Sequence, residues 1–385
     1  MLDSFIGPNR PISWVAHFWP VLTFSFISAL VATSLCKKIA LKYGIVDRPD
    51  DLVKTHKGTV AYLGGIGMLV GFAVGVLSGI YCIRDQEYFP AALTWLVGAM
   101  AGGAIACFIG LVDDIFDIKP WQKMLGQVGA ALVLVAVGVM PSLGFFDAYL
   151  GLHIPESVQM ILSVLIVIIF VVGATNSLNL LDGLDGLCAG VTVIITVAML
   201  LLAIHLGTWG SSKVGGDSVR VIVCLGLLGA VCGFLPFNRY PAKIFMGDAG
   251  SMLLGFAVAT LMILFGEKVP RWWMASIVVF GLPILDTAVA LVRRFTNKRP
   301  LFVSDRGHIY DQMIDRGMPL KKTVAICYAV AGMYALIGLV MSQIRTRYAL
   351  VVYAVVCICS AYVVWKKGYL KMEGLRGAIR KNRDY

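Results

Sequence analysis

The sequence predicts an all-α fold, a polytopic bundle of helices embedded in a membrane. Hydrophobic residues occupy 59% of the 385 positions and charged residues only 14%, whereas soluble domains carry charge at about a quarter of their positions. Apolar windows of roughly 17 to 25 residues, the length that crosses a bilayer, recur along nearly the whole chain. These observations argue against a water-soluble core and favour one transmembrane domain over residues 1–385.

Each apolar window is interpreted as one spanning helix, and about eleven such helices are expected. The longest predicted connection has about thirty residues, so no separate soluble domain is expected. The predicted spans lie near 13–36, 62–83, 91–112, 124–141, 157–175, 187–206, 219–236, 249–266, 273–292, 323–343 and 348–365.

The distribution of Lys and Arg orients the bundle, because these residues favour the cytoplasmic side of a membrane. With the N-terminus outside and the C-terminus inside, the inner loops and tail hold 25 of the 33 Lys and Arg residues. We expect a multi-pass protein of the plasma (inner) membrane. This topology and the attraction to anionic lipids account for the net charge of +11, so no nucleic-acid partner is expected. The segments assigned to the cytoplasm are 37–61, 113–123, 176–186, 237–248, 293–322 and the basic tail 366–385.

Ionisable side chains gather on the predicted cytoplasmic side, whereas the outer loops hold only scattered acids. Because carboxylates repel one another, such a cluster at an apolar boundary is unfavourable without a cation. Mg²⁺ is the natural counter-charge, since it binds oxygen ligands and completes its shell with phosphate oxygens. The cluster comprises Asp47, Asp50, Asp51, His56, Asp113, Asp114, Asp117, Asp182, Asp185, Asp248, Asp305 and His308.

The stretch NSLNLLDGLDGL places Asn176, Asn179, Asp182 and Asp185 at a spacing of three residues. On a helix this spacing puts all four side chains on nearly one face. Such a polar stripe beside a long apolar run needs a polar partner at the membrane boundary.

The stretch GLVDDIFDIKP ends the third predicted span with Asp113, Asp114 and Asp117. Adjacent residues on a helix point about 100° apart, so Asp113 and Asp114 can serve two different partners. Acids at a helix C-terminus oppose the macrodipole, so a purely structural role explains them poorly.

The stretch GDAGS precedes the eighth predicted span and is typical of a tight turn that opens a helix. Two interpretations of Asp248 remain open. It could cap the N-terminus of the helix. Alternatively, Gly247 and Gly250 let the backbone approach a phosphate while Asp248 binds a metal.

Basic side chains accompany the acids in two of the inner loops. Lys54, His56 and Lys57 lie in the first, and the ninth contains the stretch RRFTNKRPLFVSDRGHIYDQ with Arg306 and His308. Positive-inside bias alone could produce them. Their coincidence with an acidic cluster favours a polyphosphate substrate.

Taken together, these stretches resemble the polyprenyl-phosphate N-acetylhexosamine-1-phosphate transferase family (glycosyltransferase family 4). The resemblance is carried by GLVDDIFD, NSLNLLDGLDGL, FNRYPAKIFMGDAGS and SDRGHIYDQ, in this order, over residues from about 44 to 311. The chain is more similar to the branch that makes undecaprenyl-diphospho-GlcNAc than to the muramoyl-pentapeptide branch. That second branch typically carries three consecutive histidines in the ninth loop, which are absent here.

The resemblance implies a reaction in which UDP-GlcNAc and undecaprenyl phosphate give undecaprenyl-diphospho-GlcNAc and UMP, with Mg²⁺ as cofactor and Mn²⁺ as a substitute. It implies that Asp113 engages or deprotonates the lipid phosphate. It also implies catalytic roles for Asp114 and Asp248 at the metal and pyrophosphate site. A homodimer is left open. The implied metal ligands are Asn179, Asp248 and Asp114, and the implied substrate-binding residues are His56, Lys57, Asn176, Asp182, Asp185, Arg306 and His308.

Two departures from the family pattern are visible. The GlcNAc branch usually shows His-x-His-His in the ninth loop, whereas this chain reads His308, Ile309, Tyr310 and Asp311. A proline common before the double glycine of the first loop is also replaced, in VAYLGG. Because of the first departure, another nucleotide-sugar donor, such as UDP-MurNAc-pentapeptide, remains an alternative to UDP-GlcNAc.

Three alternatives concern the chemistry. An intramembrane prenyltransferase also uses Asp-rich motifs, but it does not need GDAGS or the basic ninth loop. A transporter would place its site near the bilayer midplane, where only Asp286 lies deep in a predicted span, and that residue is expected to be a buried hydrogen-bonding partner. Within the transferase, direct attack by the lipid phosphate is favoured over an aspartyl-phosphate route.

Overall fold

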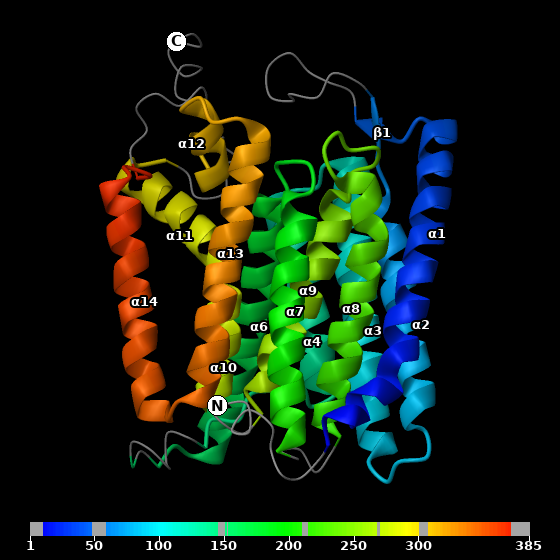
Figure 1. Cartoon of the computed structure of the whole chain (residues 1–385), viewed down its shortest axis with the longest axis vertical. Helices are drawn as coiled ribbons and strands as arrows, with labels where there is room; N and C mark the ends of the chain where they lie inside the picture. The colour runs from blue at the N-terminus through cyan, green and yellow to red at the C-terminus, as the bar shows by residue number, and fades with distance from the viewer. Residues whose placement is uncertain are drawn as a thin grey trace.

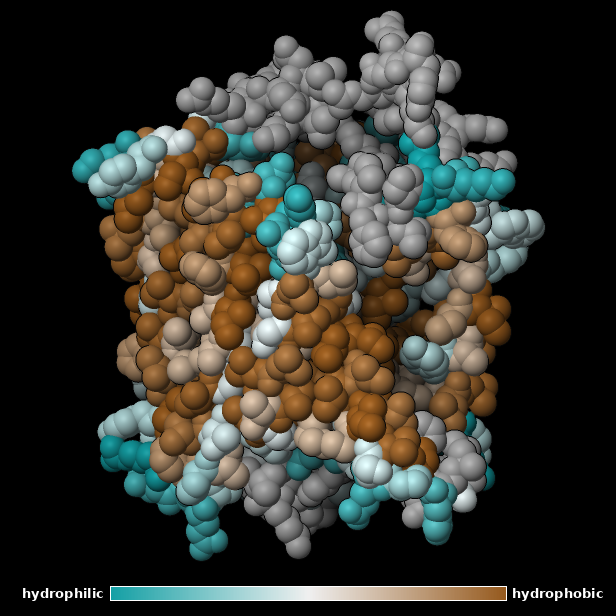
Figure 2. Space-filling view, turned by 180° about the vertical axis from the view of Figure 1, so that it is seen from behind, coloured by the Kyte–Doolittle hydropathy of each residue, from teal (hydrophilic) through white to brown (hydrophobic). Residues whose placement is uncertain are grey.

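The computed structural model describes residues 11–47, 59–144, 151, 153–209, 215–267, 270–299 and 307–370. Within these ranges the chain is an upright bundle of helices (Figure 1), which confirms the predicted all-α membrane fold. Nine of the described helices are long and apolar enough to cross a membrane, or ten if one bent pair counts as a span. Hydrophobic side chains form a band between two hydrophilic ends (Figure 2).

A helix occupies each of the eleven predicted spans, although α4 has only 17 residues, at the lower limit for crossing a bilayer. The count of spans and the orientation of the termini therefore stay predictions. A two-stranded antiparallel sheet, β1 (Val46–Asp47) and β2 (Val60–Ala61), lies beside the end of α1. The helices are η1 (Ile12–Phe18), α1 (Trp19–Tyr43), α2 (Gly64–Ile83), α3 (Phe89–Phe116), α4 (Pro120–Ala136), α6 (Glu156–Leu181), α7 (Leu187–Thr208), α8 (Gly216–Asn238), α9 (Gly247–Phe265), α10 (Pro270–Val279), α11 (Gly281–Thr296), α12 (Ile309–Asp315), α13 (Leu320–Gln343) and α14 (Thr346–Lys366).

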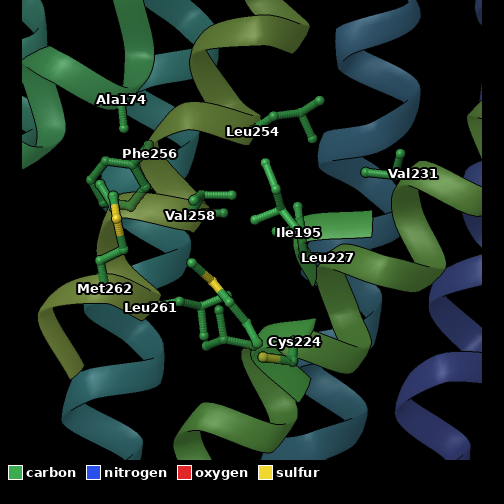
Figure 3. Close-up of a cluster of buried hydrophobic side chains, with 14 of the residues drawn as sticks. Ala174, Ile195, Cys224, Leu227, Val231, Leu254, Phe256, Val258, Leu261 and Met262 are labelled. Carbon is green, nitrogen blue, oxygen red and sulfur yellow. The ribbon is translucent and has the colours of Figure 1, made fainter. Parts of the chain in front are cut away.

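Helix α9 is the centre of the bundle, because it is apolar on all sides and other helices surround it. Within its most apolar stretch, 94% of the residues are buried. Figure 3 shows Leu254 of α9 near Ile195 of α7 and Leu227 of α8, and Phe256 of α9 on another side, toward Ala174 of α6. The N-terminus of α9, which carries Asp248, is therefore enclosed at one end of the bundle.

Two glycines let neighbouring helices approach the first turn of α9 closely. A Cβ atom at Gly110 of α3 would overlap the backbone of Asp248, and one at Gly65 of α2 would overlap the backbone of Gly250. The strand before α2 also binds this segment, since Phe245 donates its N–H to the carbonyl of Ala61 at 2.9 Å. The start of α9 is thus fixed by both α2 and α3.

The ninth predicted span is not straight: α10 and α11 meet at an angle of 68°. Asp286 of α11 is 1% exposed and accepts hydrogen bonds at 2.7 Å from His308 Nδ1 and from the backbone N–H of Ile309. Its expected role as a buried hydrogen-bonding partner is confirmed. This contact joins α11 to α12 at the same end of the bundle as the start of α9 (Figure 1).

Candidate active site

Lys123, in the first turn of α4, is the centre of the polar cluster. Its Nζ lies 2.8 Å from Asp113 Oδ2 and 3.2 Å from Asn179 Oδ1, and it also contacts Asp248 Oδ2. The lysine side chain is only 13% exposed, so water screens these contacts little. Helices α3, α4, α6 and α9 each contribute one of these four side chains.

The Asp248 side chain is held from two sides. Asn179 Nδ2 donates to Asp248 Oδ1 at 2.7 Å and to Ser251 Oγ at 3.1 Å, while the other Asp248 oxygen meets Lys123. The side chain therefore does not cap its own helix, which was one of the two interpretations of GDAGS.

Asp114 is the residue that caps α9. Its Oδ1 accepts the backbone N–H of Asp248 at 2.8 Å and its Oδ2 accepts that of Ala249 at 3.1 Å. Gly247 has a φ of +68°, and a Cβ there would overlap the Asp114 carboxylate, so glycine is required for the contact. As the sequence predicted, the adjacent residues Asp113 and Asp114 serve two different partners.

The polar stripe of NSLNLLDGLDGL is divided in the structure, because α6 ends at Leu181. Asn176 and Asn179 share a face of α6, but Asn176 pairs with Gln127 of α4 at 2.8 Å, one turn below the Lys123 cluster. Asp182 and Asp185 lie in the loop that follows. Asp185 Oδ2 accepts the backbone N–H of Ala242 at 2.9 Å.

Asp182 has an unusual electrostatic setting. Burial, followed by the nearby charges of Asp248 and Asp114, raises the pKa of the Asp182 carboxyl well above its usual range. Among the residues that the structure describes, none donates a hydrogen bond to this carboxylate. A hydrogen-bond donor or a cation supplied by a ligand would stabilise the charged carboxylate against both its burial and the repulsion from Asp248 and Asp114.

The remaining predicted site residues divide into one that is placed and three that are not. His308 is buried against Asp286 and stacks on Tyr310, with ring centroids 5.7 Å apart and planes at 11°. Its ring contacts Asp286 and Tyr310, so it supports α12. His56, Lys57 and Arg306 lie outside the described residues.

Sequence reasoning missed Lys123, although a signal was present. A cation in the first turn of a helix opposes the positive end of the macrodipole, and Lys123 stands three residues into α4. Such a residue is favourable only if acids lie opposite it. The structure supplies Asp113 and Asp248.

The donor set can be compared with the needs of Mg²⁺. No group of three His, Cys, Asp or Glu side chains within the described ranges is arranged to hold a metal. Mg²⁺, however, usually takes one or two carboxylates and completes its shell with water and phosphate oxygens. Asp248 and the amide oxygen of Asn179 are hard oxygen ligands of this kind, so the residues fit the cation. In this structure both of them contact the Lys123 ammonium.

The fold and site define a class: an integral membrane protein with a buried lysine–carboxylate–amide site where four helices meet. The model of the glycosyl transferase family 4 matches residues 95–266, the range that contains Asp113, Lys123, Asn179 and Asp248. The chain belongs to this family, in agreement with the resemblance of its motifs. Family membership also removes the basis for a prenyltransferase or a transporter.

Several relatives carry closely related names. The chain is 30% identical over 332 residues to a probable undecaprenyl-phosphate N-acetylglucosaminyl 1-phosphate transferase of Bacillus subtilis (strain 168), covering 83% of each chain. It is 29% identical to a decaprenyl-phosphate N-acetylglucosaminephosphotransferase of Mycolicibacterium smegmatis, over 85% of this chain and 81% of the relative. It is 26% identical to the undecaprenyl-phosphate alpha-N-acetylglucosaminyl 1-phosphate transferase of Escherichia coli (strain K12), over 81% and 82%.

Proposed function

We propose that this chain transfers GlcNAc-1-phosphate from UDP-GlcNAc to undecaprenyl phosphate, giving undecaprenyl-diphospho-GlcNAc and UMP. This is a first membrane step of cell-envelope polysaccharide synthesis. The names of the relatives support the reaction. The observation that carries it here is the convergence of Asp113, Lys123 and Asp248 at one end of a lipid-embedded bundle.

The position of the site suits two substrates of opposite solubility. Undecaprenyl phosphate approaches from the bilayer, while UDP-GlcNAc approaches from water, so their phosphates meet only at the boundary. The bias of Lys and Arg toward the loops at this end supports the cytoplasmic face of the plasma membrane as that boundary.

Lys123 and Asp113 are assigned to the acceptor phosphate. An oxygen of the lipid phosphate attacks the phosphorus that bears GlcNAc, and the bond from that phosphorus to the UMP oxygen breaks. Asp113 takes the proton of the acceptor phosphate if one is present, and the Lys123 ammonium holds the phosphate oxygens. Positioning of two charged groups supplies most of the rate enhancement in such a transfer.

Mg²⁺ is proposed as the cofactor, with Asp248 and Asn179 as its ligands. When bound it would neutralise the diphosphate and stabilise the leaving UMP. Asp114 is assigned a positioning role, because both of its oxygens already accept backbone N–H groups. EDTA is expected to abolish UMP release, and Mg²⁺ or Mn²⁺ to restore it; full activity in chelator would contradict the proposal.

Direct displacement is proposed over an aspartyl-phosphate intermediate, because Lys123 engages both Asp113 and Asp248 and lowers their nucleophilicity. An isotope-exchange experiment tests this choice. Protein incubated with UDP-GlcNAc and radiolabelled UMP, without undecaprenyl phosphate, is expected to form no labelled UDP-GlcNAc. Exchange that depends on Asp113 or Asp248 would show a covalent intermediate.

The donor is tested with purified protein in detergent, undecaprenyl phosphate and Mg²⁺. UDP-GlcNAc, UDP-GalNAc and UDP-MurNAc-pentapeptide are supplied separately, and UMP and the lipid product are quantified. We expect product from UDP-GlcNAc alone. Product from another donor would show that the HIYD motif accompanies a different sugar, and UMP release from none of them by folded protein would refute the proposed function.

A further inference from the structure

The loop between α6 and α7, residues 182–186, is held at both ends by tyrosine hydroxyls; we name it the acidic loop. Tyr310 of α12 donates to the carbonyl of Leu180 at 2.8 Å, and Tyr328 of α13 donates to the carbonyl of Gly186 at 2.6 Å. The Leu180 carbonyl lies in the last turn of α6, where carbonyls lack an intrahelical partner. Two helices from the C-terminal third of the chain thus bind the backbone at the two ends of one loop of the site.

Glycines allow both tyrosines to rest directly on the backbone. A Cβ at Gly183 would overlap the Tyr310 phenol, and one at Gly190 would overlap the Tyr328 phenol. The contacts therefore include close packing as well as a hydrogen bond. A shift of either ring would move the loop or leave a void beside it.

Tyr310 is itself firmly supported. It is 4% exposed and stacks on His308, which is bound to Asp286 of α11. Burial raises the pKa of the Tyr310 phenol far above its usual value, so the hydroxyl stays protonated and remains a donor. These contacts connect α11 through α12 to the acidic loop.

We propose that Tyr310 and Tyr328 are positioning residues that hold the acidic loop so that Asp182 faces the nucleotide-sugar. The identity of the ligand rests on the proposed function. Asp182 stands near Asp248 and Asp114, whose charges repel it, and no donor in the described part of the chain anchors its carboxylate. The position of Asp182 therefore depends on the backbone that carries it. The two hydroxyls bind that backbone, together with Asn238 Oδ1, which accepts the Gly186 N–H at 3.1 Å, and with Asp185, which accepts the Ala242 N–H.

This chain carries the contact at a position where the GlcNAc branch usually shows histidine. An imidazole in place of Tyr310 is shorter than a phenol, so it would not span the same distance to the Leu180 carbonyl. Tyr310→His is therefore an informative variant beside Tyr310→Phe, which keeps the ring and removes only the hydroxyl.

The test compares Tyr310→Phe and Tyr328→Phe with Tyr334→Phe. Tyr334 is a matched control on α13, since its hydroxyl pairs with Ser360 Oγ at 2.6 Å, away from the loop. Loss of one hydrogen bond is expected to raise the KM for UDP-GlcNAc by about three- to tenfold. The KM for undecaprenyl phosphate and kcat are expected to stay within about twofold. The control is expected to change none of them.

Amide hydrogen exchange of residues 180–190 gives a second readout, which does not need turnover. Both loop variants are expected to exchange faster there than wild type, and Tyr334→Phe is not. Unchanged exchange in both variants would overturn the proposal whatever the kinetics show. Faster exchange with an unchanged donor KM would overturn the assignment to nucleotide-sugar binding. If wild-type protein releases no UMP, the proposed function fails, and exchange alone decides whether the tyrosines hold the loop.

Discussion

Asp114 accepts the backbone N–H of Asp248 at 2.8 Å, so these two acidic residues meet through the backbone of one and the side chain of the other. The contact caps α9 and leaves the Asp248 side chain to face Lys123 and Asn179. The adjacent acids of α3 therefore have different partners. Asp113 contacts the Lys123 ammonium, and Asp114 fixes the N-terminus of α9, the helix that carries Asp248.

Removal of this cap is expected to affect both stability and activity. Asp114→Ala leaves two N–H groups of α9 without their acceptor, which should lower the free energy of unfolding by about 1 to 2 kcal/mol. Asp114→Asn keeps one acceptor oxygen and should lose less. Thermal unfolding in detergent and UMP release at equal folded protein measure both effects. An Asp114→Ala protein with wild-type stability would contradict the capping role.

Asp113→Ala and Asp248→Ala are expected to abolish turnover while the protein remains folded and inserted. Each variant leaves one carboxylate for Lys123, so the cluster keeps an ion pair but loses a group that touches substrate or metal. Size-exclusion profiles establish folding, and Asp85→Ala at the opposite end of the bundle is the control. Wild-type rates in either site variant would refute the site.

Lys123→Met is expected to lower kcat by about 100-fold or more, because it removes a preorganised cation and leaves two carboxylates facing each other. Lys119→Met, an exposed lysine one turn earlier, should behave like wild type. Lys123→Arg keeps the charge but not the compact shape of the ammonium, and is expected to be intermediate. Equal rates for Lys123→Met and Lys119→Met would remove Lys123 from the mechanism.

The His308–Asp286 pair is expected to make stability depend on pH. Burial alone lowers the pKa of His308, but its hydrogen bond to Asp286 and the charge of that carboxylate raise it overall. A raised pKa in the folded state means that the pair stabilises fully below the unfolded pKa of about 6.5 and less as pH rises through the folded pKa. Asp286→Asn removes the charge and can still accept the Ile309 N–H.

The thermal midpoints of wild type and Asp286→Asn should therefore differ more at about pH 5.5 than at about pH 8.5. Lys322→Gln, a charge change at an exposed position in the first turn of α13, shows how a pH response unrelated to the pair would look. A difference that is constant with pH, or larger at alkaline pH, would contradict a charged His308.

The sequence alone determined where the helices lie and at which end of the bundle the acids cluster. Apolar length is a local property, so every predicted span is helical, although the ninth is divided between α10 and α11. The inner loops bring together acids that the motifs contain. The expected division of Asp113 from Asp114 also followed from local geometry, since adjacent residues on a helix point about 100° apart and can serve different partners.

Tertiary structure alone decided which polar residues meet. Lys123 reaches Asp113 and Asp248 because α4 packs beside α3 and α6 while α9 stands at the centre. The early end of α6 at Leu181 separates Asn176 from Asp182, and the tyrosines come from helices over 120 residues further along the chain. Such contacts depend on how helices that are distant in the sequence pack together. Hydrophobic packing determines which residues are buried, but it does not determine which polar side chains pair at the helix ends.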